Sequence, residues 1–386
     1  MQLRFSSVAE ELWGTRNPLY ALHDELRAEG KPVVDLVRGN VNEHGMVFPE
    51  EILKDILSRA VSPAAVYKPD SFGQPAAREA VAAYYAELKF TPEQVLITPG
   101  TSLSYLYCFK LLADAGGEIL CPRPSYPLFD YIAKICGVEL THYRLLEARD
   151  WAIDLEHLEH QITTKTRAII LISPHNPTGM VASDDQLAGL AEIAERHHLP
   201  IIADEVFSEF LFGLEKLPRP AATKAPLVFT LNGFSKMFAL PGIKLGWMTV
   251  SGESQLVKKS MSALEMISDT FLPVNEIVQF SVPEIFGSGK KFQRDYVAWV
   301  RRCYEKAMGG LADLDFARPR GGFHVTVPTF EDEEKAATDL LREYGILTHP
   351  GYYYDIQPNH LVMTFIHEPR TLTKCFRRIG LAARLA

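Results

Sequence analysis

The chain has 386 residues, of which 47% are hydrophobic and 23% are charged, the balance of an ordinary globular protein long enough for two domains. A chain of this size buries a core that needs no disulfide or metal to stabilise it. Its formal net charge of −8 argues against nucleic acid or an anionic membrane as a main partner, because either needs a basic protein surface.

The cysteines and the apolar segments indicate a cytoplasmic protein. The five cysteines form no CxxC pair and are odd in number, which favours reduced thiols over disulfides. His197 and His198 form the tightest histidine pair, but no cysteine lies near them in the sequence, so we predict no metal site. The first 14 residues lack the apolar run of a signal peptide, and no stretch approaches the ~20 apolar residues of a membrane span.

Short apolar runs alternate with helical patterns through the middle of the chain. Helices are expected over Thr101–Ala113, Pro127–Cys136 and Ser183–His197, the last with Ser183 as a plausible N-cap. Most strand segments are apolar without strict alternation, which is typical of strands covered on both faces. The alternation predicts an α/β fold with a mainly parallel seven-stranded sheet. The expected strands are Val95–Thr98, Glu118–Cys121, Glu139–Tyr143, Ala168–Ser173, Pro200–Asp204, Leu227–Asn232 and Gly246–Val250.

The pattern changes after about residue 285. A long helical stretch, Lys290–Leu311, precedes a turn at Gly321 and Gly322, and short strand-like segments follow at Phe323–Val327 and Leu361–Phe365. These features predict a smaller α+β domain, with which we expect the N-terminal segment to pack. The expected bounds are 46–285 for the large domain, and 1–45 with 286–386 for the small one.

Polar residues follow several of the expected strands, where ligands bind in such sheets. Gly100, Thr101 and Ser102 lead directly into a helix, and free N–H groups at a helix start can hold a phosphate. A glycine turn with a threonine N-cap explains the same residues without a ligand. Asn176 lies in a turn-forming segment after another strand, where its amide would reach the sheet edge.

Asp204 and Lys236 are the most reactive residues at these strand ends. An acid that ends a buried apolar strand is costly unless it is paired, and a pyridinium nitrogen would be a suitable partner. A salt-bridged or helix-capping aspartate is the alternative. Lys236 lies in an apolar loop flanked by glycines, where desolvation lowers the pKa of a lysine and suits it to Schiff-base chemistry. Any single lysine is more often a solvated surface charge.

Three segments, in this order and spacing, resemble the class I/II aminotransferases of the pyridoxal 5′-phosphate (PLP) fold-type I superfamily. They are SPHNPTG at 173–179, ADEV at 203–206 and GFSKMFALPGIKLGW at 233–247. The resemblance extends from about Val33 to Phe365. It implies a PLP cofactor and the transfer of an amino group between an amino acid and a 2-oxo acid through a Schiff base on Lys236.

The resemblance also implies roles for individual residues. Lys236 matches the lysine that moves the proton as well as holding the cofactor, and Asp204 matches the partner of the pyridinium nitrogen. Asn176 matches the donor to the cofactor's O3′, and Tyr126 matches the aromatic residue that stacks on the ring. The residues expected at the phosphate are Gly100, Thr101, Ser102, Ser235 and Lys244.

The family is typically a homodimer with shared active sites. Tyr67 matches a tyrosine that reaches the phosphate in the neighbouring subunit, and Gly39 matches a glycine on the substrate side. We therefore expect a homodimer that binds a small amino donor and a 2-oxo acid acceptor, with no nucleic acid or membrane partner.

Three residues depart from the family pattern. Phe207 replaces a tyrosine that also donates to O3′, and Lys244 replaces an arginine, which keeps the charge but loses the bidentate fork. Val362 replaces the arginine that binds the substrate α-carboxylate. We expect Arg38 or Arg320 to bind that carboxylate instead.

Two other functions fit the same motifs. The motifs predict the cofactor but not the reaction, so a β-elimination lyase or a decarboxylase is one alternative, and the missing arginine favours it. A non-catalytic PLP-binding regulatory protein is another. Lys236 and Asp204 are both present, which argues against a loss of catalysis.

Overall fold

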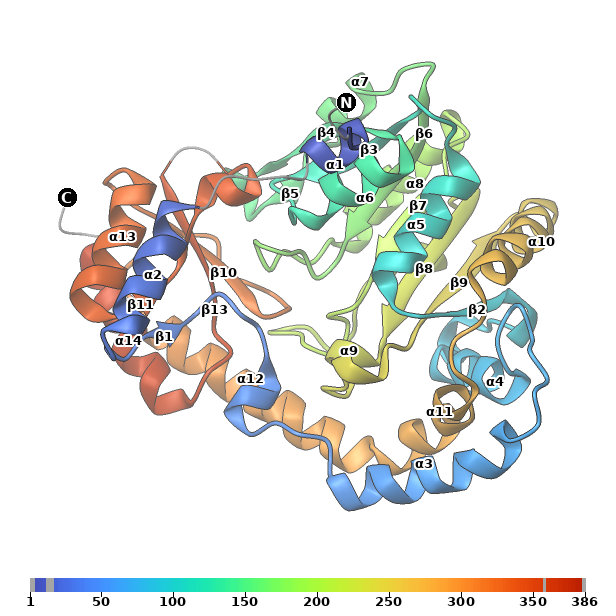
Figure 1. The fold of residues 1–386 in the computed structure, drawn as a ribbon. Helices are drawn as coiled ribbons and strands as arrows, with labels where there is room; N and C mark the ends of the chain where they lie inside the picture. The colour runs from blue at the N-terminus through green and yellow to red at the C-terminus, as the bar shows by residue number, and fades with distance from the viewer. Residues whose placement is uncertain (1–3, 12–16, 357–358, 384–386) are drawn as a thin grey trace.

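A computed structural model describes residues 4–11, 17–356 and 359–383, so part of the 14-residue segment considered above for a signal peptide lies outside the described residues. The centre of the fold is an eight-stranded sheet in the order β2-β9-β8-β7-β6-β3-β4-β5, and Figure 1 shows it flanked by helices. The mixed α/β fold and all seven expected strands are confirmed. The strands are β2 Val95–Thr98, β3 Glu118–Arg123, β4 Glu139–Leu146, β5 Ala152–Ile153, β6 Thr166–Ile172, β7 Ile201–Asp204, β8 Leu227–Gly233 and β9 Gly246–Gly252.

The sheet is mainly parallel. Strands β4, β3, β6, β7 and β8 run parallel to one another, whereas β9 is antiparallel to both β2 and β8, and β5 is antiparallel to β4. Every residue of β7 and β8 is buried, which explains why both strands are apolar without alternation. The additional strand β5 has two residues and pairs with the edge strand β4, and it is too short to give a sequence signal.

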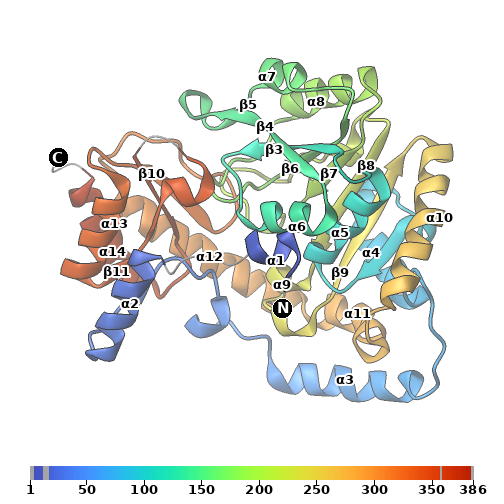
Figure 2. The same cartoon turned by 45° about the horizontal axis from the view of Figure 1, so that its top comes forward.

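Helices cover both faces of the sheet (Figure 2). Helices α5 (Thr101–Leu112), α6 (Leu128–Cys136) and α10 (Ser254–Phe271) pack in one core, and α7 (Leu155–His160) and α8 (Asp184–Arg196) pack in the other. The expected cap of α8 is confirmed, because the Ser183 side chain accepts a hydrogen bond from the backbone N–H of Gln186. Further helices are α1 Ser7–Glu11, α3 Glu50–Ala64, α4 Pro75–Tyr84, α9 Phe234–Met237 and α11 Glu276–Ser288.

A smaller sheet lies to the left of the large sheet in Figure 1. Its antiparallel strands have the order β10-β13-β12, and a separate parallel pair joins β1 to β11. The pairing of β1 with β11 brings residues 34–35 beside residues 346–347. The strands are β1 Val34–Asp35, β10 His324–Pro328, β11 Ile346–Leu347, β12 His349–Pro350 and β13 His360–Thr364, and the helices are α2 Pro18–Ala28, α12 Lys290–Gly310, α13 Glu333–Tyr344 and α14 Pro369–Ala382.

None of the helices within the described ranges is both long enough and apolar enough to cross a membrane.

Candidate active site

A cavity of about 490 Å³ opens where strands β6 and β7 end and helices α5 and α9 begin. Its position agrees with the rule that ligands bind at the carboxyl ends of the strands of such sheets. We call it the strand-end cavity. Its lining includes the predicted residues Arg38, Gly39, Thr101, Ser102, Tyr126, Asn176, Asp204, Phe207, Ser235 and Lys236.

Four predicted residues do not line this cavity. Gly100 directly precedes α5 with φ of +123°, a left-handed conformation that favours glycine, and so it shapes the helix start rather than the wall. Lys244 and Tyr67 are exposed, Tyr67 to 76%. Arg320 is also exposed, and its backbone forms hydrogen bonds with the backbones of Gly179 and Phe212.

Lys236 lies on the short helix α9, where burial lowers the pKa of its amino group. Its Nζ is 5.8 Å from the ring centroids of both Phe207 and Phe323. Within the described part of the chain, no carboxylate forms an ion pair with this amino group. A lysine in an apolar setting without a counter-ion is suited to covalent chemistry, because its neutral, nucleophilic form is favoured.

Asp204 ends β7 with only 7% of its surface exposed, and burial raises the pKa of its carboxyl to about 6. The hydroxyl of Tyr105 donates to Oδ2 at 2.9 Å, and the backbone N–H of Val206 donates to Oδ1 at 3.0 Å. Among the described residues no basic side chain pairs with it. A buried carboxyl that lacks a cation fits the protonated ring nitrogen of PLP.

Asn176 supplies a second sign of a missing ligand. Its Oδ1 is buried without a hydrogen-bond partner, although buried polar atoms are usually paired. Together with Lys236 and Asp204, which have no ion-pair partner among the described residues, and with the hydroxyls of Thr101 and Ser235 at helix starts, this residue fits PLP. The amide N–H of Asn176 would donate to the ring oxygen, and the helix starts would hold the phosphate.

The sequence did not point to four residues that shape the cavity. Tyr105 holds Asp204, and it lies four residues after Thr101 in α5, on the same helix face, which is the signal that would have found it. The other three, from the smaller sheet and the loop after β12, are His324, His349 and Tyr354.

The wall that the smaller sheet contributes is electrically neutral. Burial lowers the pKa of His324 to about 3 and that of His349 to about 4, so both imidazoles are uncharged near pH 7. Val362 lies in β13, is 1% exposed and pairs with Thr326 and His349. No arginine therefore enters the cavity from this position.

Phe207 is 4% exposed, and its ring meets those of Phe323 and His324 edge to face. The ring therefore packs between the cavity and the core that lies under the smaller sheet. The absence of a hydroxyl here leaves Asn176 as the predicted donor to the cofactor's ring oxygen.

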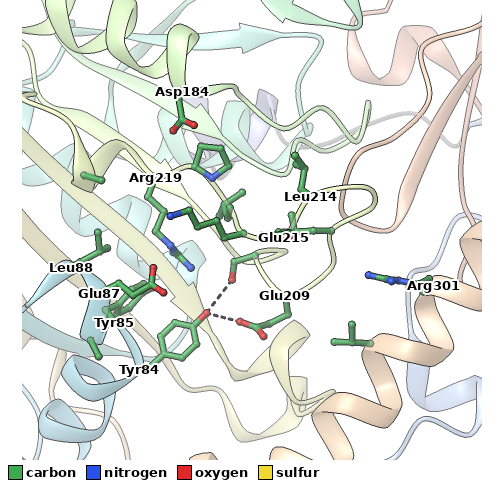
Figure 3. Close-up of a pocket in the computed structure, with 18 residues that line it drawn as sticks. Tyr84, Tyr85, Glu87, Leu88, Asp184, Glu209, Leu214, Glu215, Arg219 and Arg301 are labelled. Carbon is green, nitrogen blue, oxygen red and sulfur yellow. Dashed lines mark hydrogen bonds between the residues drawn. The ribbon is translucent and has the colours of Figure 1, made fainter.

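A second cavity of about 630 Å³ contains none of the predicted residues (Figure 3). It lies between the end of α4, the loop 208–219 and helix α12. Glu209 accepts hydrogen bonds there from Tyr84 and Gln293, and Arg219 pairs with the buried Glu205. Among the described residues that line this second cavity, none is a residue predicted to bind the cofactor or the substrate, so the strand-end cavity remains the candidate active site.

The fold and the strand-end cavity define an enzyme of the PLP fold-type I class. The chain belongs to the class I and II aminotransferases, because the model of that family matches residues 32–379. Aminotransferases of this class depend on PLP, so the protein is a PLP-dependent enzyme that transfers amino groups. The β-elimination and decarboxylation alternatives are not favoured.

Curated relatives support this assignment. The chain is 29% identical to the glutamate–pyruvate aminotransferase AlaA of Escherichia coli, over 90% of this chain and 89% of the relative. It is 30% identical to the same enzyme of Haemophilus influenzae, over 86% and 85%. It is 27% identical to the alanine aminotransferase of Mycobacterium tuberculosis, over 97% and 91%.

Solved structures have the same fold. An aminotransferase from Escherichia coli superposes with a TM-score of 0.87 at 27% identity, covering 100% of this chain and 99% of that one. A double mutant of the Thermus thermophilus aspartate aminotransferase superposes with a TM-score of 0.85 at 25% identity, covering 99% and 100%.

Proposed function

We propose that the enzyme exchanges an amino group between an amino acid and a 2-oxo acid, with L-alanine and 2-oxoglutarate as the first pair to test. The observation that carries the proposal is that the amino group of Lys236 and the buried carboxyl of Asp204 both line the strand-end cavity, and neither has a counter-ion within the described part of the chain. The choice of substrates follows the relatives named for glutamate–pyruvate and alanine amino transfer.

The proposed roles divide the chemistry among the residues of this cavity. PLP, when bound, supplies an electron sink for the carbon next to the substrate nitrogen. Lys236 holds the cofactor covalently and then carries a proton to and from the reacting carbon. Asp204 would keep the ring nitrogen protonated, and Thr101, Ser102 and Ser235 would bind the phosphate. Gly100 would shape the helix start, and Lys244 would add a positive charge from outside the lining.

The direct test is a product analysis of the PLP-loaded enzyme with L-alanine and 2-oxoglutarate. We expect pyruvate and glutamate to form in equal amounts, without release of ammonia or carbon dioxide. Other amino acids serve as donors in parallel reactions and define the preference. Ammonia release without formation of a new amino acid would show elimination and would overturn the proposal.

The substrate carboxylate is the next part of the proposal. Arg38 lines the strand-end cavity, with its Nε 3.3 Å from Asp35 and its side chain 60% exposed. Among the described residues that line this cavity, Arg38 and Lys236 are the arginine and lysine side chains, and His324 and His349 are uncharged near pH 7, so we assign Arg38 to the carboxylate. Gly39 lies beside it, and a Cβ there would come 3.6 Å from Phe323 and 3.7 Å from Thr364, in ordinary contact with the substrate-side wall.

Replacing Arg38 with alanine should raise the KM for the amino acid tenfold or more, roughly, because a charge-assisted contact contributes about 1.5–3 kcal/mol. Steady-state kinetics at several donor concentrations measure this. Arg320→Ala is the matched control and should leave KM unchanged, since Arg320 does not line the cavity. An unchanged KM in Arg38→Ala would contradict the assignment.

We also propose a homodimer in which Tyr67 acts in the neighbouring active site. The 76% exposure of Tyr67 supports this, because a family tyrosine at this position works across the interface. Mixing Tyr67→Phe subunits with Lys236→Ala subunits should restore activity. One site of each hybrid then carries both changes and the other carries neither, so hybrids should reach about half of wild-type activity. Mixtures with no gain over the parents would exclude the shared site.

The division into a large domain (46–285) and a small domain (1–45 with 286–386) also belongs to the proposal, as does a cytoplasmic location. The pairing of β1 with β11 supports the domain division. The five cysteines, all free and buried, are compatible with a reducing compartment and support the cytoplasmic location.

A further inference from the structure

His349 lies where the structure lacks a carboxylate-binding arginine. It is the cross-strand partner of Val362 in the β12–β13 pair, and directly opposed residues of an antiparallel pair place their side chains on the same face. Its imidazole lines the strand-end cavity, whereas Val362 is buried in the core beside it. The polar group at this point of the wall is therefore a neutral imidazole.

Both nitrogens of this imidazole are bound by tyrosines. Nε2 lies 2.7 Å from the hydroxyl of Tyr20, and Nδ1 lies 2.9 Å from the hydroxyl of Tyr354. Tyr354 lines the cavity with His349, but Tyr20 comes from α2 and is not part of the lining. The three residues form a chain of hydrogen bonds from the protein surface, where Tyr20 is 38% exposed, to the cavity.

The proton count of this chain allows two arrangements. Burial lowers the pKa of His349 to about 4, so near pH 7 the ring has one N–H donor and one acceptor nitrogen. If Nε2 accepts the proton of Tyr20, Nδ1–H donates to Tyr354, and the hydroxyl proton of Tyr354 is free. In the reverse arrangement Tyr354 donates to Nδ1, and the free hydroxyl proton is that of Tyr20, outside the cavity lining.

A carboxylate in the cavity selects the first arrangement. It offers an anionic acceptor to the free proton of Tyr354, and hydrogen bonds to charged acceptors are stronger than neutral ones. Hydrogen bonds in a chain also polarise one another. The hydrogen bond from Tyr20 to His349 therefore makes the Tyr354 hydroxyl, at the other end of the chain, a stronger donor. Arg38 lines the same cavity as Tyr354.

We propose that Tyr20, His349 and Tyr354 form a donor relay in which the Tyr354 hydroxyl binds a carboxylate oxygen of the amino or oxo acid substrate. This inference rests on the proposed function and names the group that recognises the carboxylate together with Arg38. Tyr354 contacts the substrate, whereas Tyr20 and His349 are positioning residues that leave the hydroxyl proton of Tyr354 free to donate into the cavity.

The kinetic test uses hydroxyl deletions in the PLP-loaded enzyme. Tyr20→Phe removes one oxygen outside the cavity lining, and it should raise the KM for the amino acid roughly three- to tenfold with kcat within about twofold. Tyr354→Phe should raise KM at least as much. The double variant should match Tyr354→Phe alone, because Tyr20 acts only through Tyr354.

Tyr131→Phe, at a tyrosine on α6 that is 48% exposed, is the control and should leave KM unchanged. Additive effects in the double variant, or a Tyr20→Phe enzyme with wild-type KM, would overturn the relay.

A second measurement does not depend on turnover. When pyruvate is added to the PLP-loaded enzyme without an amino donor, no amino transfer can occur, so calorimetry measures its binding affinity alone. In the same complex, ¹⁵N NMR of labelled histidine reports the tautomer of His349. With saturating pyruvate we expect His349 protonated at Nδ1, and in Tyr20→Phe we expect a shift towards Nε2 with weaker pyruvate binding. His349→Gln identifies the signal.

An Nε2–H tautomer in the pyruvate complex of the wild-type enzyme would overturn the relay. If the wild-type enzyme bound pyruvate with the expected tautomer but failed to transaminate, the proposed function would fail while the relay stood.

Discussion

Replacing Lys236 with alanine should reduce the rate of amino transfer by about 10³-fold or more, because the change would remove both the proposed covalent link to the cofactor and the proposed proton carrier. The amino group lies 5.8 Å from the ring centroids of Phe207 and Phe323, and among the described residues that line the cavity there is no second lysine to take over. Rates of pyruvate formation from L-alanine measure the loss.

Borohydride reduction of the PLP-loaded wild-type enzyme, followed by peptide mapping, should place the cofactor label on Lys236. Lys258, an exposed lysine on α10, is the matched control, and Lys258→Ala should retain both the label and the activity. A label on any other lysine, or a Lys236→Ala enzyme with wild-type turnover, would contradict the assignment.

The residues recognised from the sequence share one property. Asn176 and Lys236 follow apolar strands, and Asp204 ends one. These strands are buried along all or most of their length, and the ends of parallel strands meet at one sheet edge. Local patterns therefore place these groups together without knowledge of the packing. The same argument recovered the strands of the large sheet, whereas β5 has only two residues and carries no pattern.

Apart from Tyr105, the residues that shape the cavity and that the sequence missed depend on long-range pairing. His349 and Tyr20 lie 329 positions apart, and their hydrogen bond forms only after β12 pairs with β13 and α2 packs nearby. The register of such pairs is determined by packing and turns far from either residue, so a histidine in a two-residue strand gives no local signal. The replacement of the carboxylate-binding arginine by Val362 was visible in the sequence. The imidazole of His349, which lies opposite Val362, was not.

Asp204→Asn should have opposite effects on the protein with and without its cofactor. In the cofactor-free protein, burial raises the pKa of Asp204 to about 6, whereas an unfolded aspartate titrates near about 3.9. The folded state thus binds more protons between these values, and the free energy of unfolding falls as pH rises through this window, by up to about 3 kcal/mol. Roughly half of that loss falls between pH 5 and pH 7.5.

Asparagine cannot ionise, and it fits the site because its oxygen can accept from Val206 while its amide donates to the hydroxyl oxygen of Tyr105. In urea unfolding of the cofactor-free protein, the free energy of unfolding of the variant relative to wild type should therefore rise by about 1–1.5 kcal/mol between pH 5 and pH 7.5. The bound cofactor reverses the sign, because its ring nitrogen loses a buried anionic partner, a change that costs about 3–5 kcal/mol. PLP affinity at pH 7.5 should fall at least 100-fold, roughly. A variant that keeps wild-type PLP affinity and gains no stability at the higher pH would show that Asp204 has another role.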